Sequence, residues 1–300
     1  MSVPRIPRRL AADLALLAVA GFWGLTFPLG KIVLSSLGPF TYLAARFGIA
    51  ALALIAGWPR RQVAAPRREW TAGAAVGGVL FLGYALQTTG LGLTTASNSG
   101  LITGLSVAMV PVISAAWFRR VPRPGVLAGI AAAVIGLALL TLSESVRGNL
   151  GDVLTLGCAF CFALHIVLVG RLTRGFDPVA FATAQITTVA ILSGIVALVE
   201  RPLAPLSAAP PAVWGMIAFM AATGTIGAFL IQVWAQTFTS ASHTGLMFTF
   251  EPVAAALTAY LILGEVLAGR QALGAALNLA GIVLAELNHE ASETQVEDGT

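Results

Sequence analysis

The feature that most constrains this chain is a series of long apolar stretches separated by short polar connections. A bilayer core about 30 Å thick needs about 20 apolar residues per helix, and ten such stretches can be marked along the 300 residues. Hydrophobic residues make up 57% of the chain and charged residues only 10%, too few to cover a water-soluble fold. The sequence therefore predicts an all-α integral membrane protein and excludes a soluble enzyme or a disordered chain.

The connections between these stretches carry residues typical of loops, such as Gly38-Pro39, Asp177-Pro178 and Pro210-Pro211. No segment remains for a soluble domain. The ten predicted spans are Leu10–Leu34, Pro39–Gly57, Trp70–Gly92, Ser97–Phe118, Pro124–Leu142, Asp152–Val169, Pro178–Val199, Ala212–Thr237, His243–Leu263 and Gln271–Leu287.

Lysine and arginine are unequally divided between the two sets of connections. Positively charged loops tend to stay in the cytoplasm, so the richer side predicts cytoplasmic N and C termini, including an acidic tail over residues 288–300. The Arg residues form short clusters rather than one basic patch, which favours membrane lipid over nucleic acid as a partner. The richer side has Arg5, Arg8, Arg9, Arg60, Arg61, Arg67, Arg68, Arg119, Arg120, Arg123, Arg171 and Arg174, and the poorer side has Lys31, Arg147, Arg201 and Arg270.

The two halves of the chain, residues 10–142 and 152–287, resemble each other. An offset of 145 residues places Ala96–Leu101 on Ala241–Leu246 and aligns glycines of the fifth and tenth spans. Because each half holds five spans, the second half must enter the membrane in the opposite orientation. Two inverted repeats of this kind are typical of transporters that open alternately to the two sides.

Several short motifs, in this order and spacing, resemble the EamA family of the drug/metabolite transporter superfamily. They are Trp23-Gly24, Arg46-Phe47, the Ala-Ser-x-x-Gly-Leu openings of the fourth and ninth spans, Glu251-Pro252, Gly264-Glu265, and Gly274 with Gly281. The resemblance covers about residues 10 to 287 and implies a multi-pass exporter of small metabolites, amino acids among them, in the bacterial inner membrane. It departs at Arg119-Arg120, where the second half has Gly264-Glu265, so the two halves are not equivalent.

Polar and aromatic residues inside the spans are the candidates for lining a transport path. At an offset of 139 Thr26 pairs with His165, and at 145 Gln87 pairs with Gln232 and Ser106 with Glu251. Amides beside aromatic rings suit a small zwitterion or amphiphile, although Gln also commonly forms hydrogen bonds between spans. The candidate cavity residues are Trp23, Thr26, Tyr84, Gln87, His165, Phe229, Gln232, Trp234 and Phe250.

Three ionisable residues lie deep in the predicted spans. Glu251 is the candidate for proton coupling, because a carboxyl group in a low-dielectric span can stay protonated at neutral pH; its alternative role is to pair with a buried donor. His165 is a second candidate for coupling or substrate binding, or a packing residue. Arg46 stays charged, so we expect a structural role in which it pairs with a carbonyl or carboxylate group.

Proline removes a helical hydrogen bond, so Pro28, Pro111 and Pro252 should bend the first, fourth and ninth spans, either as hinges or as static bends. No motif for nucleotide binding is present. Cys158 and Cys161 favour packing over metal binding, because no further thiol or His cluster completes a ligand set. We therefore expect no cofactor and no metal.

These observations predict a monomeric carrier that exports amino acids, including aromatic or hydrophobic ones, or similar small metabolites by alternating access. A multidrug or cation exporter is the first alternative, weakened by the shortage of acidic residues in the cavity. A less favoured alternative is an intramembrane lipid-modifying enzyme that would use His165 and Glu251 as acid and base.

Overall fold

The computed structural model describes residues 8–117, 124–141, 149–173, 175–200, 209–237 and 239–297. Within these ranges every regular element is a helix. The first half contains α1 (Arg8–Leu34), α2 (Pro39–Gly57), α3 (Pro59–Ala64), α4 (Arg67–Leu93), α5 (Ala96–Trp117) and α6 (Pro124–Thr141). The second half contains α7 (Leu150–Leu172), α8 (Pro178–Ala197), α9 (Pro211–Ala221), the π-helix η2 (Ala222–Gly227), α10 (Ala228–Gln236), α11 (Ala241–Phe248), α12 (Phe250–Leu263) and α13 (Gly269–Glu297).

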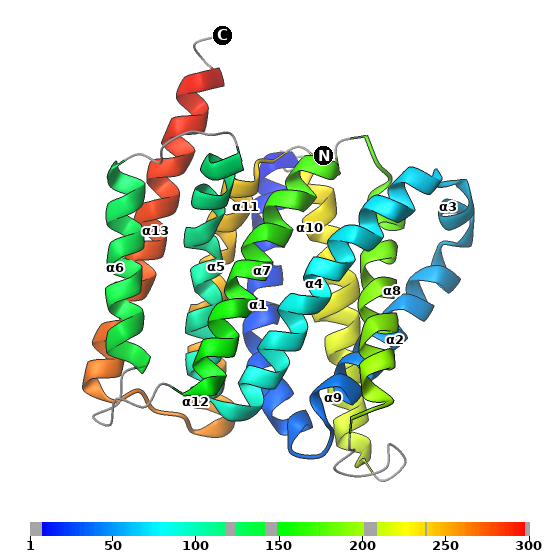
Figure 1. Ribbon diagram of the computed structural model, residues 1–300, viewed down its shortest axis with the longest axis horizontal. Helices are drawn as coiled ribbons and strands as arrows, with labels where there is room; N and C mark the ends of the chain where they lie inside the picture. The colour runs from blue at the N-terminus through cyan, green and yellow to red at the C-terminus, as the bar shows by residue number, and fades with distance from the viewer. Residues whose placement is uncertain are drawn as a thin grey trace, which may run out of the picture.

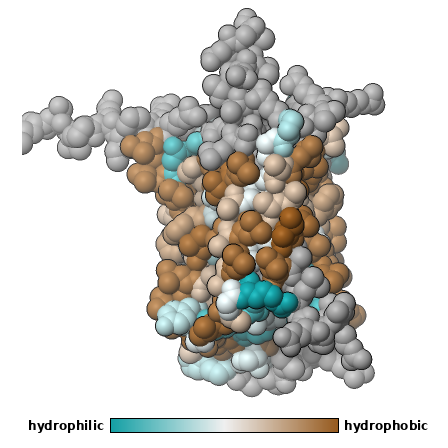
Figure 2. Space-filling view, turned by 90° about the vertical axis from the view of Figure 1, so that its left-hand side faces the viewer, coloured by the Kyte–Doolittle hydropathy of each residue, from teal (hydrophilic) through white to brown (hydrophobic). Residues whose placement is uncertain are grey.

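The long helices stand side by side in one bundle, and both ends of the chain lie at the same end of it (Figure 1). Among the described residues, eight segments are long and apolar enough to cross a membrane, and Pro124–Gly136 in α6 is a shorter apolar helix. The surface over α6 and α13 is largely hydrophobic, with hydrophilic residues mainly toward its two ends (Figure 2). The helical, membrane-spanning fold predicted from the sequence is therefore confirmed.

Two predicted spans are interrupted. The eighth changes from α9 into the π-helix η2 before continuing as α10, which the sequence analysis did not foresee. The ninth is divided at Thr249 between α11 and α12. Thr249 lies three residues before Pro252, and proline has no N–H to donate to the carbonyl group one turn before it. Pro28 and Pro111 instead lie within the continuous helices α1 and α5.

The last helix also differs from its predicted length. Helix α13 continues past Leu287 to Glu297, so most of the predicted acidic tail is helical, and residues 298–300 lie outside the described part. The short helix α3 was not predicted either. Its six residues are too few to give a periodic pattern in the sequence.

The contact between α6 and α13 relates the two halves by a pseudo-two-fold axis. A Cβ atom added at Gly136 would overlap the backbone nitrogen of Asn278, and one added at Gly281 would overlap the backbone nitrogen of Ala133. The offset of 145 residues exchanges these two contacts, since it carries Gly136 to Gly281 and Ala133 to Asn278. The same backbone approach thus occurs twice, once in each direction, as in a two-fold interface.

Gly281→Ala is expected to destabilise the protein, because the new methyl group must push α13 away from the α6 backbone. The expected loss is about 1–3 kcal/mol, seen as a lower thermal unfolding temperature in detergent. Gly215→Ala in α9 is the matched control, because its Cβ would enter open space and Ala favours a helix. Equal unfolding temperatures for the two variants would contradict this account of the interface.

Candidate functional site

A small cavity lies at the centre of the bundle, and about 40 Å³ of it is open to the centre of a water molecule. It is bounded by residues from both halves, and the three pairs related by the repeat offsets, Thr26 with His165, Gln87 with Gln232, and Ser106 with Glu251, all face it. The lining residues are Trp23, Thr26, Phe27, Leu80, Tyr84, Gln87, Ser106, Phe162, His165, Ile166, Phe229, Gln232, Phe248 and Glu251. The pseudo-two-fold axis therefore brings corresponding positions of the two repeats to one site.

Aromatic rings form much of the cavity wall. The Trp23 ring packs against Phe248 and Phe229, with centroid separations of 4.8 and 5.8 Å. Tyr84 packs edge-on against Phe162 at 5.2 Å and against Phe229 at 6.4 Å. Edge-to-face rings of this kind present both apolar surface and electron-rich faces, which suit an apolar group or a cation.

A single backbone carbonyl, that of Gly224 in η2, fixes two neighbouring side chains. Trp23 Nε1 donates to it at 2.9 Å and Arg46 Nη2 at 3.0 Å. A π-helix displaces the regular i to i−4 hydrogen-bonding pattern, which leaves this carbonyl available to other helices. The wall residue Trp23 is thereby tied to the eighth span.

Arg46 is held behind the cavity wall rather than facing the cavity. Its Nε donates to Thr225 Oγ1 at 2.9 Å and its Nη1 to the Tyr42 hydroxyl at 3.2 Å. The guanidinium carbon lies 5.5 Å from the centre of the Tyr84 ring. These contacts satisfy a buried charge, so the arrangement gives Arg46 the carbonyl partner expected from the sequence and leaves it no free face for substrate.

The polar groups of the cavity are only partly satisfied. His165 Nε2 lies 2.7 Å from Gln185 Oε1, and Gln87 Nε2 donates to Thr103 Oγ1 at 3.3 Å. By contrast Gln232 Oε1 is buried without a partner. Among the described residues no group hydrogen-bonds the Glu251 carboxyl group, which faces the cavity. Unpaired buried polar atoms are costly, so both groups are ready to bind a ligand or water.

The prediction that they line the cavity was wrong for two residues, Trp234 and Phe250. Trp234 lines a groove on the outside of the bundle with Leu230 and Ile231, because it lies two residues after Gln232 and therefore on the opposite face of α10. Phe250 is 45% exposed, because the break at Thr249 changes which face of the ninth span looks inward. Phe248 lines the cavity in its place.

Phe27 and Phe162 also line the cavity, although neither was predicted from the sequence. Phe162 lies three residues before His165, and Phe248 three residues before Glu251. Side chains spaced by three share one face of a helix. That spacing from the polar candidates is the signal by which Phe162 and Phe248 could have been found.

The described residues contain no group of three or more His, Cys, Asp or Glu side chains that could hold a metal ion. Cys158 and Cys161 are both free thiols. Cys158 Sγ lies 3.6 Å from Thr103 Oγ1, a packing contact between α5 and α7.

Comparisons with known proteins cover nearly the whole chain. Residues 10–142 and 149–287 each match the model of the EamA-like transporter family. An uncharacterized transporter from Archaeoglobus fulgidus is 32% identical over 283 residues, covering 93% of this chain and 87% of that protein. The uncharacterized transporter YyaM from Bacillus subtilis is 27% identical over 291 residues, covering 93% of this chain and 94% of that protein.

The fold is also similar to that of a solved crystal structure whose description names no function. The TM-score is 0.68 at 20% sequence identity, and the match covers 94% of this chain and 99% of that chain. At this identity the likeness concerns the fold alone.

Thr225→Val is expected to destabilise the protein by about 1.5–3 kcal/mol, because it leaves the Arg46 Nε donor without its acceptor. Thr223→Val is the control, since Thr223 lies in the same π-helix but its hydroxyl donates only to Phe219 O of its own span. Thermal unfolding in detergent should separate the two variants by several degrees. Equal stability would show that the Thr225 hydroxyl does not hold the guanidinium.

Proposed function

The chain belongs to the EamA-like transporter family, and from this premise we propose that it exports amino acids or similar small metabolites by alternating access. The observation that carries this proposal is the unpaired Glu251 carboxyl group in an aromatic cavity, among amides contributed by both repeats. These lining residues offer partners for an ammonium group, a carboxylate and an apolar side chain.

The proposed topology has ten spans, with α6 and α13 added to the eight segments identified by length and hydropathy. Two features support this: α6 and α13 pack closely on each other along their length, and both chain ends lie at one end of the bundle (Figure 1), so that either both of these helices cross or neither does. The distribution of Arg residues supports a cytoplasmic position for that end. The membrane is the plasma membrane of a bacterium, the inner one where there are two.

In the proposed complex the substrate ammonium group pairs with Glu251. The free Gln232 Oε1 accepts from the same ammonium group. The substrate carboxylate takes the second N–H of the Gln87 amide, whose first N–H donates to Thr103, and rings such as Trp23 and Phe248 cover the substrate side chain. An amino acid fits this set better than an anion does, because no Lys or Arg is among the described residues that line the cavity.

Glu251 also offers a route to proton coupling. One carboxylate can pair with an ammonium group or bind a proton, but not both, so protonation on one side of the membrane releases a substrate loaded on the other. Exchange of one proton for one cationic group follows from competition at a single site. His165, whose Nε2 is engaged by Gln185, would assist in moving the proton.

Proteoliposomes containing the purified protein should take up amino acids with an apolar side chain, faster when a pH gradient is imposed. Glu251→Gln is expected to abolish the response to the gradient and to slow uptake by about tenfold or more, since it removes the charge that pairs with the ammonium group. Tyr260→Phe, on the exposed face of the same helix, serves as the control and should transport normally.

Recovery of the labelled solute unchanged, by mass spectrometry, separates a carrier from a lipid-modifying enzyme. Uptake that ignores both the gradient and Glu251→Gln would contradict proton coupling. A protein that moves none of the amino acids would contradict the proposed substrate class.

An exporter of organic cations remains the second candidate, because a lone carboxyl group surrounded by aromatic rings also suits a cationic amphiphile. The substitution Gln87→Leu distinguishes the two. Transport of an amino acid should fall about tenfold when the amide that faces its carboxylate is removed, whereas transport of a cation without a carboxylate should not change. A matching fall for both solutes would rule out this division of roles in the cavity.

A further inference from the structure

The pseudo-two-fold axis allows contacts at one end of the bundle to be compared with their counterparts at the other. In a perfectly symmetric carrier the two mouths of the transport path would be closed by the same contacts. Here the end distant from the chain termini, at the bottom of Figure 1, has charged contacts that are not repeated at the positions to which the repeat offsets carry them. We call this end the outer end.

Two opposite charges hold the turn between α4 and α5 at the outer end. Lys31 Nζ, at the end of α1, donates to Leu91 O at 2.8 Å and also to Thr94 O. Glu265, just after α12, accepts from Ala96 N at 2.9 Å and from Ser97 N at 2.8 Å. A cation at a helix C terminus and an anion at a helix N terminus both stabilise the helix dipoles.

The backbone positions Glu265 for this contact. Gly264 has a φ of +67° and ends α12 in the left-handed conformation, which favours glycine. The chain turns there so that the Glu265 carboxylate also accepts from Ser97 Oγ at 2.7 Å. We call Lys31 and Glu265, with the α4–α5 turn between them, the outer clamp.

Between the clamp and the cavity lies an apolar plug. Phe27, Leu91 and Ala96 pack with Ala255 and Ala259 in one buried cluster. Phe27 also lines the cavity, so the plug begins where the cavity ends. The clamp joins α1 and α12 on one side of this plug to α4 and α5 on the other.

The corresponding positions at the opposite end cannot form this clamp. The repeat offsets carry Lys31 to Gly170 and Leu91 to Gln236. Gly170 has no side chain and lies against Gln236 and Ala241. The counterpart of Glu265 is Arg120, a base in place of an acid, which lies outside the described residues. At the opposite end, the polar Gln236 thus stands at the position that corresponds to the apolar Leu91 of the plug.

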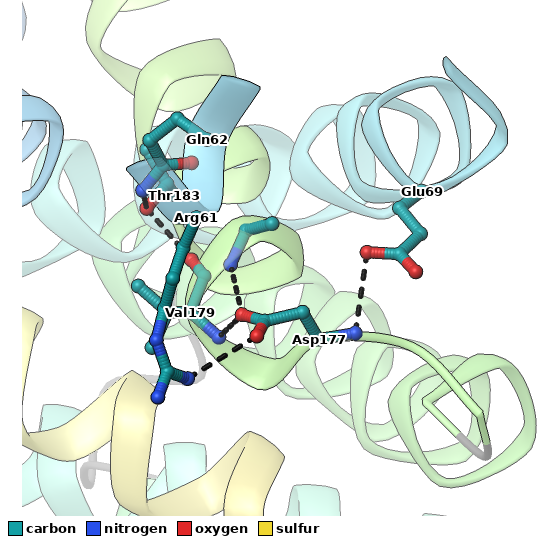
Figure 3. Close-up of polar contacts among 7 residues, drawn as sticks. Arg61, Gln62, Glu69, Asp177, Val179 and Thr183 are labelled. Atoms are coloured by element: carbon teal, nitrogen blue, oxygen red, sulfur yellow. Dashed lines mark hydrogen bonds and ion pairs between the residues drawn. The ribbon is translucent and has the colours of Figure 1, made fainter. Parts of the chain in front are cut away.

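A second pair of contacts shows the same inequality. At the outer end the Glu200 carboxylate accepts from Phe40 N at 3.1 Å and from Thr41 N at 2.8 Å. The offset of 139 residues carries Glu200 to Arg61, which pairs with Asp177 at 3.2 Å (Figure 3). That pair is 54% and 33% exposed, and exposed ion pairs contribute little. A less exposed contact at the same end joins His243 Nε2 to Asp13 Oδ1 at 2.6 Å, but it is an ion pair only while the imidazole is protonated.

We propose that Lys31 and Glu265 form the stronger of two gates, so that the resting carrier is closed at its outer end and opens first toward the end that holds the chain termini. This inference rests on the alternating access proposed above. For an exporter with cytoplasmic termini, the bias presents an empty cavity to the cytoplasm, where the substrate is loaded.

The test uses one reporter cysteine in the cavity, Ser106→Cys, in a chain whose two native cysteines are replaced by Ala. A charged thiol reagent that cannot cross membranes is applied to intact cells and to inside-out vesicles. The reporter should react slowly from the outer side and faster from the other. Lys31→Gln or Glu265→Gln should raise the outer rate by about tenfold, since each removes charge-assisted hydrogen bonds.

Two variants provide controls. Arg61→Gln removes a charged contact at the opposite end and should leave the outer rate unchanged, and Lys31→Arg keeps the charge and should stay near the parent rate. Only variants that elute as folded protein in size-exclusion chromatography are scored. If Glu265→Gln aggregates, the result with Lys31→Gln alone tests the proposal.

An outer rate that stays at the parent value in every scored variant of the clamp would overturn the proposal, as would an equal rise in Arg61→Gln. Because labelling needs no solute, failure to find an amino-acid substrate would not affect this result. The gate and the proposed substrate class can therefore fail separately.

Discussion

The carbonyl group of Gly224 accepts hydrogen bonds from Trp23 and Arg46 together, and the cavity depends on that junction. Inside a membrane no water is available to satisfy backbone groups, so they must be paired within the protein. The π-helix exposes a carbonyl that an α-helix would use internally. One irregular turn thereby joins α1, α2 and the eighth span, and it satisfies the buried guanidinium group.

The same junction explains why Tyr84 and Trp23 form stable walls. Arg46 lies behind Tyr84, and Trp23 is fixed at its ring nitrogen while its ring packs on Phe229 and Phe248. Because these wall residues already have partners, binding of a ligand is left to other groups of the described lining, among them Glu251 and one oxygen of Gln232. The scaffold and the binding groups of the cavity are thus separate sets of residues.

Much of this arrangement could be predicted from the sequence because hydropathy and the internal repeat are properties of whole segments. The second helix, Pro39–Gly57, was predicted at its observed bounds, and pairing by repeat offset brought Ser106 and Glu251 to one cavity. What could not be predicted depends on local register. The break at Thr249 turns Phe248 inward instead of Phe250, and no periodic pattern marks the π-helix of Ala222–Gly227.

The proposed function depends on the departures from two-fold symmetry. A perfectly two-fold carrier would have equal gates and a cavity with paired charges. Glu251 corresponds to Ser106, so the cavity contains one carboxyl group rather than two that would repel each other. A single charge in a low-dielectric cavity must be neutralised by a proton or by a bound cation. Net movement then requires that the two sides of the membrane differ, either in proton concentration or in the ease with which each gate opens. The sequence supplies the second difference itself, because Lys31 and Glu265 have Gly170 and Arg120 as their counterparts.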